Sequence, residues 1–402
     1  MILQNILVAV LKDQRLPLAP APEIERDVAD RLPDVSAQHA LVLSGVRRCG
    51  KSVLQAQLMR TKPGALYLNI EDTRLYGMTP EDFPALLEVI GEVAHQHAVF
   101  LDEIQELPEW PRLVRSLLDR GQPLCLTGSN ASLLGREVGA KLTGRHRSFE
   151  VFPFSYAEFL SFTKGVRSAA TLNDYLDHGG FPGYLRERDP QLLQQLLRDI
   201  VERDIAQRHH LREARHVMNL VLFLLANTGQ PVSFQRLTKA LAIPTVGQTS
   251  RYIEFLQDSY LLFAVPKFST SFKQRVVAPS KYYAIDNALR RVNSPNLTAD
   301  TGHRLENAVF LSLRRRGIHP AYAGEKDAWE CDFITDKQAI QVCAQLTRFN
   351  RDRELEGVRR ACEMPGKRAP LIVTLDQRDE LSTSGLKVPV VPASDWLDRD
   401  AS

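Results

Sequence analysis

The chain has 402 residues, of which 44% are hydrophobic and 25% charged, and its formal net charge is +3. This composition excludes a collagen-like or largely disordered chain, because there is ample apolar material to bury, and so small a charge does not by itself indicate a nucleic-acid partner. The length predicts two or three domains, since domains cluster near ~100–150 residues.

Two features of the sequence bear on the cellular compartment. No apolar run approaches the ~18–20 residues that span a bilayer, and the apolar start of the chain has neither a preceding basic region nor a small-residue cleavage site. The five cysteines are widely spaced and include no C-x-x-C pair, which argues against a disulfide framework and a structural zinc site. We therefore expect a cytoplasmic protein without a membrane segment.

The pattern of apolar and polar residues changes near residue 40. Residues 1–37 are expected to form a helix, a Pro-rich turn at 16–22 and a charged helix that ends near Pro33. After that, short apolar runs alternate with amphipathic segments of helical spacing. The four runs expected to be buried strands are 40–45, 64–70, 97–103 and 123–129. Such alternation is typical of βαβ units and predicts an α/β domain with a parallel sheet.

A complete phosphate-binding motif, G-x-x-x-x-G-K-[ST], lies between the first expected strand and the helix after it. Its glycines allow the loop to curl so that backbone N–H groups face inward, and the helix directs the positive end of its dipole at the phosphates. Lys51 is expected to reach the β- and γ-phosphates, and the Ser52 hydroxyl to coordinate Mg²⁺. The predicted nucleotide-binding residues are Gly45, Val46, Arg47, Arg48, Cys49, Gly50, Lys51, Ser52 and Val53.

Asp102 and Glu103 follow four apolar residues at the end of the third expected strand. In a parallel sheet, this end of the strand delivers its acids beside the phosphate loop. We expect Asp102 to hold Mg²⁺, directly or through water, and Glu103 to orient or deprotonate the water that attacks the γ-phosphate. A strand that ends in solvated acids would look the same, and the motif upstream favours the catalytic interpretation.

Four polar residues further along are candidates for the same site. If the fourth strand lies beside the first, Ser129 or Asn130 would contact the γ-phosphate or the attacking water, although both also suit the cap of the helix ASLLGRE. Arg145 or Arg147 would neutralise the transition state, in cis or from a neighbouring subunit. A surface arginine in a loop is the alternative interpretation of the last two.

The middle of the chain is mostly helical. Residues 148–160 predict a strand, a turn and a helix start, and residues 164–214 predict a charged helical tract with a tight turn at 179–184. Residues 216–268 have the order of a winged helix, with three helices and then a strand. The side chains that its third helix would present to a DNA groove are Thr245, Gln248, Thr249, Arg251 and Tyr252. Because the segment is not notably basic, a role in protein packing is the alternative.

The motifs GVRRCGKS, VFLDEIQ, LTGSN, LTGRHRSFEVFPFSYAEF and GGFPGY occur in this order in the chain. Together they resemble the prokaryotic AAA-type ATPases that carry a DUF4143 C-terminal region, which are relatives of the archaeal-type ATPases on the additional-strand branch of P-loop proteins. The similarity runs from about Ala40 through the mid-340s and so covers most of the chain. It implies ATP binding, slow hydrolysis, a winged-helix module and a C-terminal domain similar to PD-(D/E)xK nucleases.

The nuclease resemblance implies ligand positions in the last third of the chain. It places Glu306, Asp332 and Gln341 at the Mg²⁺ ligand positions of that core and Cys343 at the position of its lysine. A thiol cannot stabilise developing negative charge as an ammonium does, and Lys337 on the neighbouring turn is a candidate substitute. We therefore expect a vestigial site in a scaffold that binds a partner or nucleic acid, in preference to an active nuclease.

These expectations combine into one interpretation of the whole chain. The predicted parts are a P-loop ATPase domain with an N-terminal helical segment, a helical connector, a winged helix and a nuclease-like α/β domain, at residues 1–163, 164–215, 216–270 and 271–402. We expect ATP and Mg²⁺ as cofactors, slow hydrolysis that drives a conformational switch, and the catalytic residues Lys51, Glu103, Asn130 and Arg145. A protein partner or homo-oligomer is expected too. The alternatives are a nucleic-acid-binding protein regulated by ATP and a Mg²⁺-dependent DNA nuclease.

Overall fold

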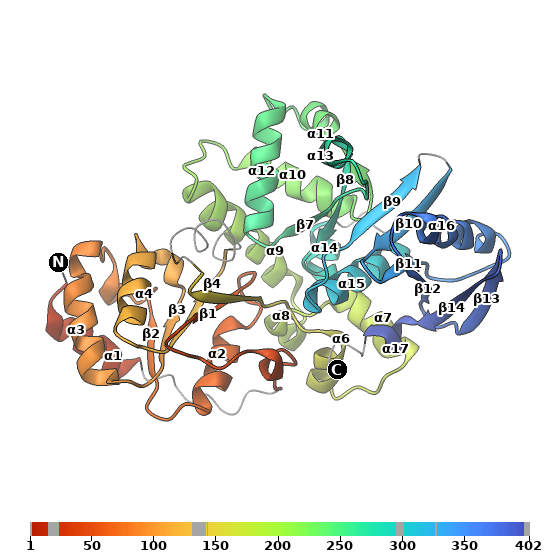
Figure 1. The fold of residues 1–402 in the computed structure, drawn as a ribbon. Helices are drawn as coiled ribbons and strands as arrows, with labels where there is room; N and C mark the ends of the chain where they lie inside the picture. The colour runs from red at the N-terminus through yellow and green to blue at the C-terminus, as the bar shows by residue number, and fades with distance from the viewer. Residues whose placement is uncertain are drawn as a thin grey trace. The chain divides into compact units, whose positions relative to one another are not determined.

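The computed structural model describes residues 2–14, 24–130, 142, 144–294, 301–325 and 328–397. The chain divides into two compact units, Met1–Phe152 and Pro153–Ser402, whose helices and strands are labelled in Figure 1. The expected Pro-rich turn at 16–22 and the expected helix ASLLGRE lie outside the described residues. Among the helices that the structure describes, none has the length and apolar character needed to cross a membrane.

The first unit contains a five-stranded parallel sheet in the order β2-β3-β4-β1-β5, as the sequence predicts. Its strands are β1 (Ala40–Ser44), β2 (Leu66–Asn69), β3 (Val99–Asp102), β4 (Leu124–Gly128) and β5 (His146–Glu150). Its helices are α1 (Gln4–Asp13), α2 (Lys51–Arg60), α3 (Phe83–Ala94) and α4 (Trp110–Asp119), with short 3-10 turns η1 (Ala29–Arg31), η2 (Thr73–Leu75), η3 (Pro80–Asp82) and η4 (Ile104–Glu106). Because β4 lies between β1 and β3, the ends of all three strands meet at one edge of the sheet.

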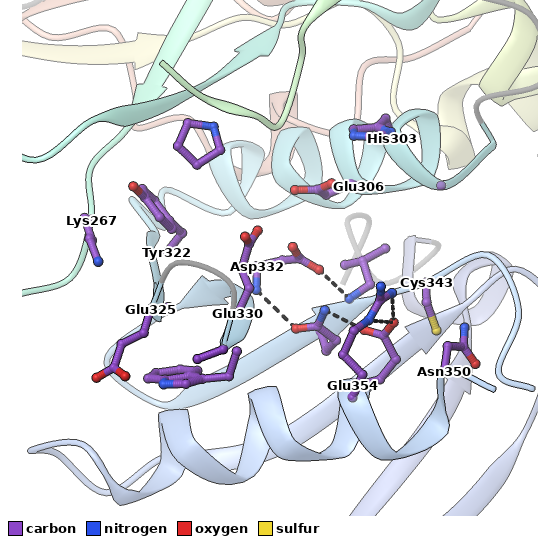
Figure 2. A pocket seen from close by; sticks show the side chains of 18 of the residues that line it. Lys267, His303, Glu306, Tyr322, Glu325, Glu330, Asp332, Cys343, Asn350 and Glu354 are labelled. Atoms are coloured by element: carbon purple, nitrogen blue, oxygen red, sulfur yellow. Dashed lines mark hydrogen bonds and ion pairs between the residues drawn. The ribbon is translucent and has the colours of Figure 1, made fainter. Parts of the chain in front are cut away.

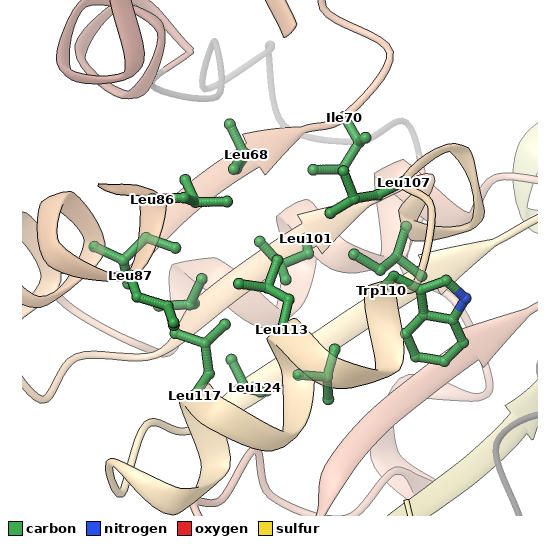
Figure 3. Packing of buried hydrophobic residues seen from close by; sticks show 14 of the residues in the cluster. Leu68, Ile70, Leu86, Leu87, Leu101, Leu107, Trp110, Leu113, Leu117 and Leu124 are labelled. Atoms are coloured by element: carbon green, nitrogen blue, oxygen red, sulfur yellow. The ribbon is translucent and has the colours of Figure 1, made fainter. Parts of the chain in front are cut away.

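Apolar residues at helical spacing fix two helices against this sheet. In α4 the buried side chains recur at three- and four-residue intervals, which gives the helix one apolar stripe. Figure 3 shows Leu113 and Leu117 of α4, together with Leu86 of α3, beside Leu101 and Leu124 of the strands. Full burial of each such leucine contributes about 1.5–3 kcal/mol, so this layer is a main source of stability in the unit that carries the phosphate loop.

The expected charged helix before Pro33 is wrong, since only the 3-10 turn η1 forms there. The preceding residues turn inward instead of presenting a solvated helical face. Ile24 and Arg26 are both buried, and the Arg26 guanidinium donates hydrogen bonds to backbone carbonyl groups elsewhere in the unit. A segment whose charged side chain finds its partners in this way is held by tertiary contacts rather than by helical hydrogen bonds.

The second unit combines helices with two sheets. A mixed sheet has the order β13-β14-β12-β11-β10-β9, and a small antiparallel sheet has the order β6-β8-β7. The strands are β6 (Pro231–Val232), β7 (Leu262–Val265), β8 (Ser280–Ala284), β9 (Ala321–Glu325), β10 (Trp329–Ile334), β11 (Gln338–Val342), β12 (Ala369–Thr374), β13 (Asp379–Thr383) and β14 (Leu386–Pro392). Apolar runs in the sequence predict β7, β8, β10, β11 and β12 as strands, whereas the polar edge strand β13 buries one residue and carries no such signal.

The helices of the second unit begin directly after the boundary. They are α6 (Tyr156–Thr163), α7 (Ala169–His178), α8 (Pro182–Glu187), α9 (Pro190–Asp199), α10 (Arg215–Ala226), α11 (Phe234–Ala240), α12 (Val246–Asp258), α13 (Phe272–Val277), α14 (Asn287–Asn293), α15 (Thr301–Arg315), α16 (Arg351–Glu363) and α17 (Ala393–Leu397). A π-helical segment, η6 (Ile200–Gln207), continues α9. The expected connector, winged helix and nuclease-like region therefore lie together in one unit.

The turn at 179–184 explains why the boundary falls before residue 163. The N–H of Gly180 donates to Asp286 Oδ2 at 2.7 Å, and its carbonyl accepts from the N–H of Phe154 at 2.8 Å. Tyr175 and Arg315 donate to the carbonyl of Phe154 as well, each at 3.1 Å. The chain that leaves the parallel sheet is thus bound at once by the second unit, and the family motif GGFPGY has a structural role there.

Candidate active site

The phosphate loop has the strand–loop–helix context that its motif predicts, between β1 and α2. Gly50 has φ +103°, a backbone conformation that favours glycine. At Gly45 a Cβ atom would lie 2.0 Å from the carbonyl oxygen of Val151, so only glycine fits beside the end of β5. Both glycines of the motif are therefore required by the local backbone, and the loop curls at the carboxyl edge of the sheet.

Lys51 begins α2, and its side chain is buried against its own loop. Its Nζ donates to the carbonyl oxygens of Gly45 at 3.0 Å and Val46 at 3.3 Å, and lies 3.8 Å from Glu103 Oε1. The side chain of Cys49 is fully buried, and burial raises the pKa of its thiol. The loop thus presents a cation next to an acid, and a thiol that stays protonated.

Ser52 and Asp102 meet at the entrance to α2. The Ser52 hydroxyl donates to Asp102 Oδ2 at 2.9 Å, and the Tyr67 hydroxyl donates to the same oxygen at 2.7 Å. Thr127 donates to the other carboxylate oxygen. Burial and the Asp102 charge raise the pKa of Tyr67, so it remains a donor. A hydroxyl and a carboxylate in contact are ligands that Mg²⁺ accepts, and these two side chains fit such an ion.

Glu103 follows at the end of β3 in a left-handed conformation, with φ +52°. Its N–H donates to Thr127 Oγ1 at 3.0 Å, and its Oε2 accepts a 2.5 Å hydrogen bond from Gln105 Nε2. A positive φ is strained for a residue other than glycine and is held by surrounding contacts. The turn directs this carboxylate toward Lys51, and Gln105 is an orienting side chain that the sequence motif did not reveal.

The end of β4 lies beside the phosphate loop, because β4 pairs directly with β1. The N–H of Gly45 donates to the carbonyl of Gly128 at 3.3 Å, and the Ser44 hydroxyl donates to the carbonyl of Asn130 at 2.8 Å. Ser129 Oγ lies 3.3 Å from Gln105 Nε2. The fourth strand therefore lies beside the first, as the expectation for Ser129 and Asn130 required, and Ser129 is close to Gln105, which contacts Glu103.

Arg145 lies far from its own phosphate loop. Its carbonyl accepts from the N–H of Ala40 at 3.1 Å, at the amino end of β1, whereas the loop follows the carboxyl end of that strand. Its guanidinium pairs with Asp119 at the end of α4. Arg147 lies in β5 opposite Leu41 and is exposed. The expectation that an arginine of this segment acts in cis is wrong, because Arg145 lies at the amino ends of the strands and the phosphate loop lies at their carboxyl ends.

Arg26 is a residue of the site that sequence reasoning missed. Its guanidinium is buried and donates to the carbonyl of Cys49 at 3.0 Å and to the carbonyl of Phe152 at 2.7 Å. It thereby joins the phosphate loop to the last residue of the first unit. Nothing in the sequence distinguishes this arginine from other charged residues near Pro33, because both partners are backbone atoms distant in the chain.

The second unit has a polar pocket of about 1210 Å³ between α15, β10, β11 and α16 (Figure 2). All three expected ligand residues, Glu306, Asp332 and Gln341, line it, and Glu330 is a third acid beside Glu306 and Asp332. The three acids surround one cation. All three contact the ammonium of Lys281 on β8, which the sequence analysis did not consider. The structure thus brings the expected acids together, but around a lysine.

The amide oxygen of the third expected ligand, Gln341, already accepts a hydrogen bond, and its amide nitrogen also has a partner. Its Oε1 accepts from the N–H of Asp332 at 3.3 Å, and its Nε2 donates to Glu354 Oε2 at 2.7 Å. Cys343 is buried, and burial raises the pKa of its thiol to about 12. Lys337 is exposed on the turn between β10 and β11 and does not line the pocket. The expected substitution by Lys337 is therefore wrong, and Lys281 is the lysine at this site.

The start of α12 departs in part from the expected DNA-contact face. Thr249 is fully buried and its hydroxyl lies 2.7 Å from that of Thr238, and Tyr252 is also buried. These two positions belong to the apolar stripe that packs α12 on its neighbours. Thr245 and Arg251 are exposed, as predicted. The expected set of five is thus divided between a surface and a core.

A parallel sheet with this loop, its lysine and an acid pair at the end of β3, one strand beyond the neighbour of β1, defines a P-loop nucleotide-binding protein of the AAA type. A family model described as an AAA domain matches residues 37–160, and one described as a domain of unknown function (DUF8612) matches residues 169–297. The expected DUF4143 assignment is not shown, and the match after the AAA domain is to this other region.

Two relatives define the family more closely. The chain is 30% identical over 347 residues to an uncharacterized protein of Methanocaldococcus jannaschii, covering 80% of this chain and 78% of that protein. It is 30% identical over 378 residues to an uncharacterized protein of Haemophilus influenzae, covering 89% and 93%. The chain belongs to the family of these proteins.

Solved structures provide further similarities. A Walker-type ATPase of Pyrococcus abyssi is 17% identical, with a TM-score of 0.41, and the match covers 63% of this chain and 90% of that chain. The ORC1 protein of Aeropyrum pernix, solved in complex with DNA, is 13% identical with a TM-score of 0.31, and the match covers 73% and 96%.

Proposed function

We propose that the chain binds ATP together with Mg²⁺ at the phosphate loop and hydrolyses it slowly. The observation that carries this proposal is the meeting of Lys51, Ser52, Asp102 and Glu103 at one edge of the sheet. Backbone N–H groups of the loop and the start of α2 favour an anion there. A buried ammonium beside two acids is a suitable arrangement for a nucleotide whose charge is shared with a divalent cation.

Lys51 would exchange its hydrogen bonds to two loop carbonyls for bonds to phosphate oxygens. These carbonyls are neutral acceptors, so a charged phosphate competes well with them. Ser52 and Asp102 would hold Mg²⁺, which supplies charge neutralisation on the phosphates when it is bound. Tyr67 and Thr127 keep the Asp102 carboxylate oriented toward Ser52 through the hydrogen bonds given above.

Glu103 would accept the proton of the attacking water. Its carboxylate is close to Lys51 and is oriented by Gln105, which leaves Oε1 facing the phosphate side of the loop. General-base catalysis of this kind is worth ~10²–10⁴-fold in rate. Arg145 remains a candidate only for a neighbouring subunit's site, since its own loop is at the other end of the strands.

The nucleotide would also act on the chain that leads to the second unit. Arg26 bonds both to the phosphate loop, at Cys49, and to Phe152, the residue before the boundary. A shift of the loop on ATP binding would change this guanidinium's contacts and so the position of Phe152. We propose that hydrolysis drives a conformational switch by this route.

Calorimetry and turnover assays test the ATPase proposal. The full chain should bind ATP in the presence of Mg²⁺, Lys51→Ala should abolish binding, and Glu103→Gln should keep binding while turnover falls. Glu109→Gln is a matched control, because Glu109 is an exposed acid paired with Arg112 on the same connection. Turnover by Glu103→Gln at the parental rate would show that the base is another group, and a chain that binds no nucleotide would overturn the proposal.

DNA binding is a second candidate, favoured by one surface of the second unit. The order β6-β8-β7 with α10, α11 and α12 supports the proposal of a winged helix, and Arg236, Lys239 and Arg251 are exposed on the last two of these helices. Cations there would contact phosphates, and binding would weaken steeply with salt. Filter binding of the parent and of Arg251→Ala, with Arg112→Ala as control, tests this, and binding that does not depend on salt would argue against it.

A further inference from the structure

Lys281 is the cation at the centre of the acid cluster in the second unit. Its side chain is 1% exposed, and its Nζ lies 3.2 Å from Glu306 Oε1, 3.2 Å from Asp332 Oδ1 and 2.5 Å from Glu330 Oε1. The lysine belongs to β8 of the small sheet, whereas the acids belong to α15 and to β10 of the large sheet. The ion pairs therefore connect three elements that are distant in sequence.

A divalent cation, which the nuclease resemblance implies at this place, does not fit these donors. Mg²⁺ requires oxygens at about 2.0–2.1 Å, whereas the carboxylates here surround a nitrogen at hydrogen-bonding distances. The second oxygen of Asp332 accepts from the N–H of Val342 at 2.9 Å, and Gln341 Oε1 is taken by the N–H of Asp332. Among the residues that the structure describes, no three His, Cys, Asp or Glu side chains converge as metal ligands.

The charge on Lys281 is stable in this environment. Burial opposes an ammonium, but three carboxylate oxygens lie within 3.2 Å of Nζ and compensate for the loss of water. The Tyr283 hydroxyl donates to the same Glu306 oxygen at 2.6 Å, which fixes that carboxylate further. A buried acid needs a partner of this kind, since its desolvation is otherwise costly.

We propose that the ammonium of Lys281 takes the place of a divalent cation in this pocket, so that the three acids need no metal to be neutralised. The ammonium is part of the chain itself, so it occupies the pocket whatever the metal concentration. It satisfies Glu306, Glu330 and Asp332 together, and it stands where a metal would have to enter. The lysine of this site thus comes from β8. It serves as the cation itself and does not act beside a bound metal ion.

Titration with Mn²⁺ tests this proposal on the full, nucleotide-free chain. Asp102→Asn serves as the parent background, because it removes the acid of the phosphate loop as a competing ligand. We expect no stoichiometric Mn²⁺ binding and no change of Tm with Mn²⁺ in this parent. Lys281→Met should gain one Mn²⁺ site and a Tm that rises with Mn²⁺, and adding Asp332→Asn should remove both gains.

Lys267→Met is the matched control, because Lys267 lines the same pocket and no ion pair joins it to these acids; it should gain no Mn²⁺ site. A parent that binds Mn²⁺ and loses it on Asp332→Asn would overturn the proposal, as would a folded Lys281→Met that gains none. If Lys281→Met does not fold, the parent and its Asp332→Asn variant decide: an unchanged Tm with Mn²⁺ in both supports the proposal, and a Mn²⁺-dependent rise lost on Asp332→Asn contradicts it.

Discussion

Within the described residues, Lys51 of the first unit and Lys281 of the second are buried near acids, and the two lysines are held in different ways. Lys51 donates to two neutral carbonyl oxygens of its own loop and stays 3.8 Å from its nearest acid. Lys281 contacts three carboxylates, the closest at 2.5 Å. The first lysine can exchange its partners for a phosphate at small cost, whereas the second would leave three charges unpaired. Neutral carbonyl partners thus mark a lysine that can bind a ligand, whereas carboxylate partners mark a lysine that stabilises the fold.

Replacing each lysine by methionine is the strongest test of this contrast. Lys281→Met removes the one cation of a buried cluster and should lower the free energy of unfolding by about 3–5 kcal/mol, with ATP binding retained. Lys51→Met leaves two loop carbonyls without this donor but breaks no close ion pair, so its loss of stability should be smaller than that of Lys281→Met, while ATP binding is lost. Urea unfolding and calorimetry measure the two effects. Equal losses of stability in both variants would contradict the contrast.

Substitution of Arg26 should lower the stability of the first unit and also weaken its binding of ATP. Arg26→Ala leaves the carbonyls of Cys49 and Phe152 without this donor, and each unsatisfied buried group costs about 1–3 kcal/mol. Because one of them belongs to the phosphate loop, the KM for ATP should rise, and Arg26→Lys should restore part of it. Exposed Arg31 provides the control as Arg31→Ala. A loss of stability with an unchanged KM would limit Arg26 to a structural role.

The two units should respond oppositely to acid. Burial raises the pKa of Asp286 to about 6, above its unfolded value of ~3.9, so the contribution of Asp286 to the stability of the second unit grows as the pH falls from about 6 to about 4, by at most about 1.4 kcal/mol per pH unit. Hydrogen bonds from Arg74 lower the pKa of Asp72 in the first unit, so its contribution is lost as the pH falls below about 4.

Tryptophan fluorescence can measure this response, since Trp110 lies in the first unit and Trp329 and Trp396 in the second. In a Trp110→Phe chain, urea unfolding between pH 4 and pH 7 should report the second unit, and Asp286→Asn should reduce its pH slope. A slope that Asp286→Asn leaves unchanged would assign the effect to other groups.

The smallest expected effect concerns Gln105, which orients Glu103. Gln105→Leu removes the hydrogen bond to Glu103 Oε2 and should lower kcat about tenfold, in line with ~1.4 kcal/mol of lost orientation, while the KM for ATP stays the same. Gln235→Leu, at an exposed position, controls for the substitution itself. A change in KM alone would show that Gln105 acts on binding and not on the base.

The sequence predicts the phosphate site better than the second site for a physical reason. Gly45 to Ser52 form one continuous segment, and Asp102 and Glu103 end a strand that the apolar pattern reveals, so both are visible as local signals. The partners of Arg26 are backbone carbonyls, which carry no sequence signature. Lys281 reaches its acids from another sheet, and no spacing along the chain indicates that. The sequence could not exclude Arg145 from its own site, because only the strand register shows at which edge of the sheet it lies.

The burial of Cys49 has a practical consequence for work with thiol reagents. A protonated thiol beneath the loop backbone reacts slowly with alkylating agents and mild oxidants, because the thiolate is the reactive species. Four of the five cysteines are buried, and Cys362 alone is partly exposed. A maleimide dye should therefore attach at Cys362 first and leave nucleotide binding intact, which offers a fluorescent reporter on the second unit without removal of any native cysteine.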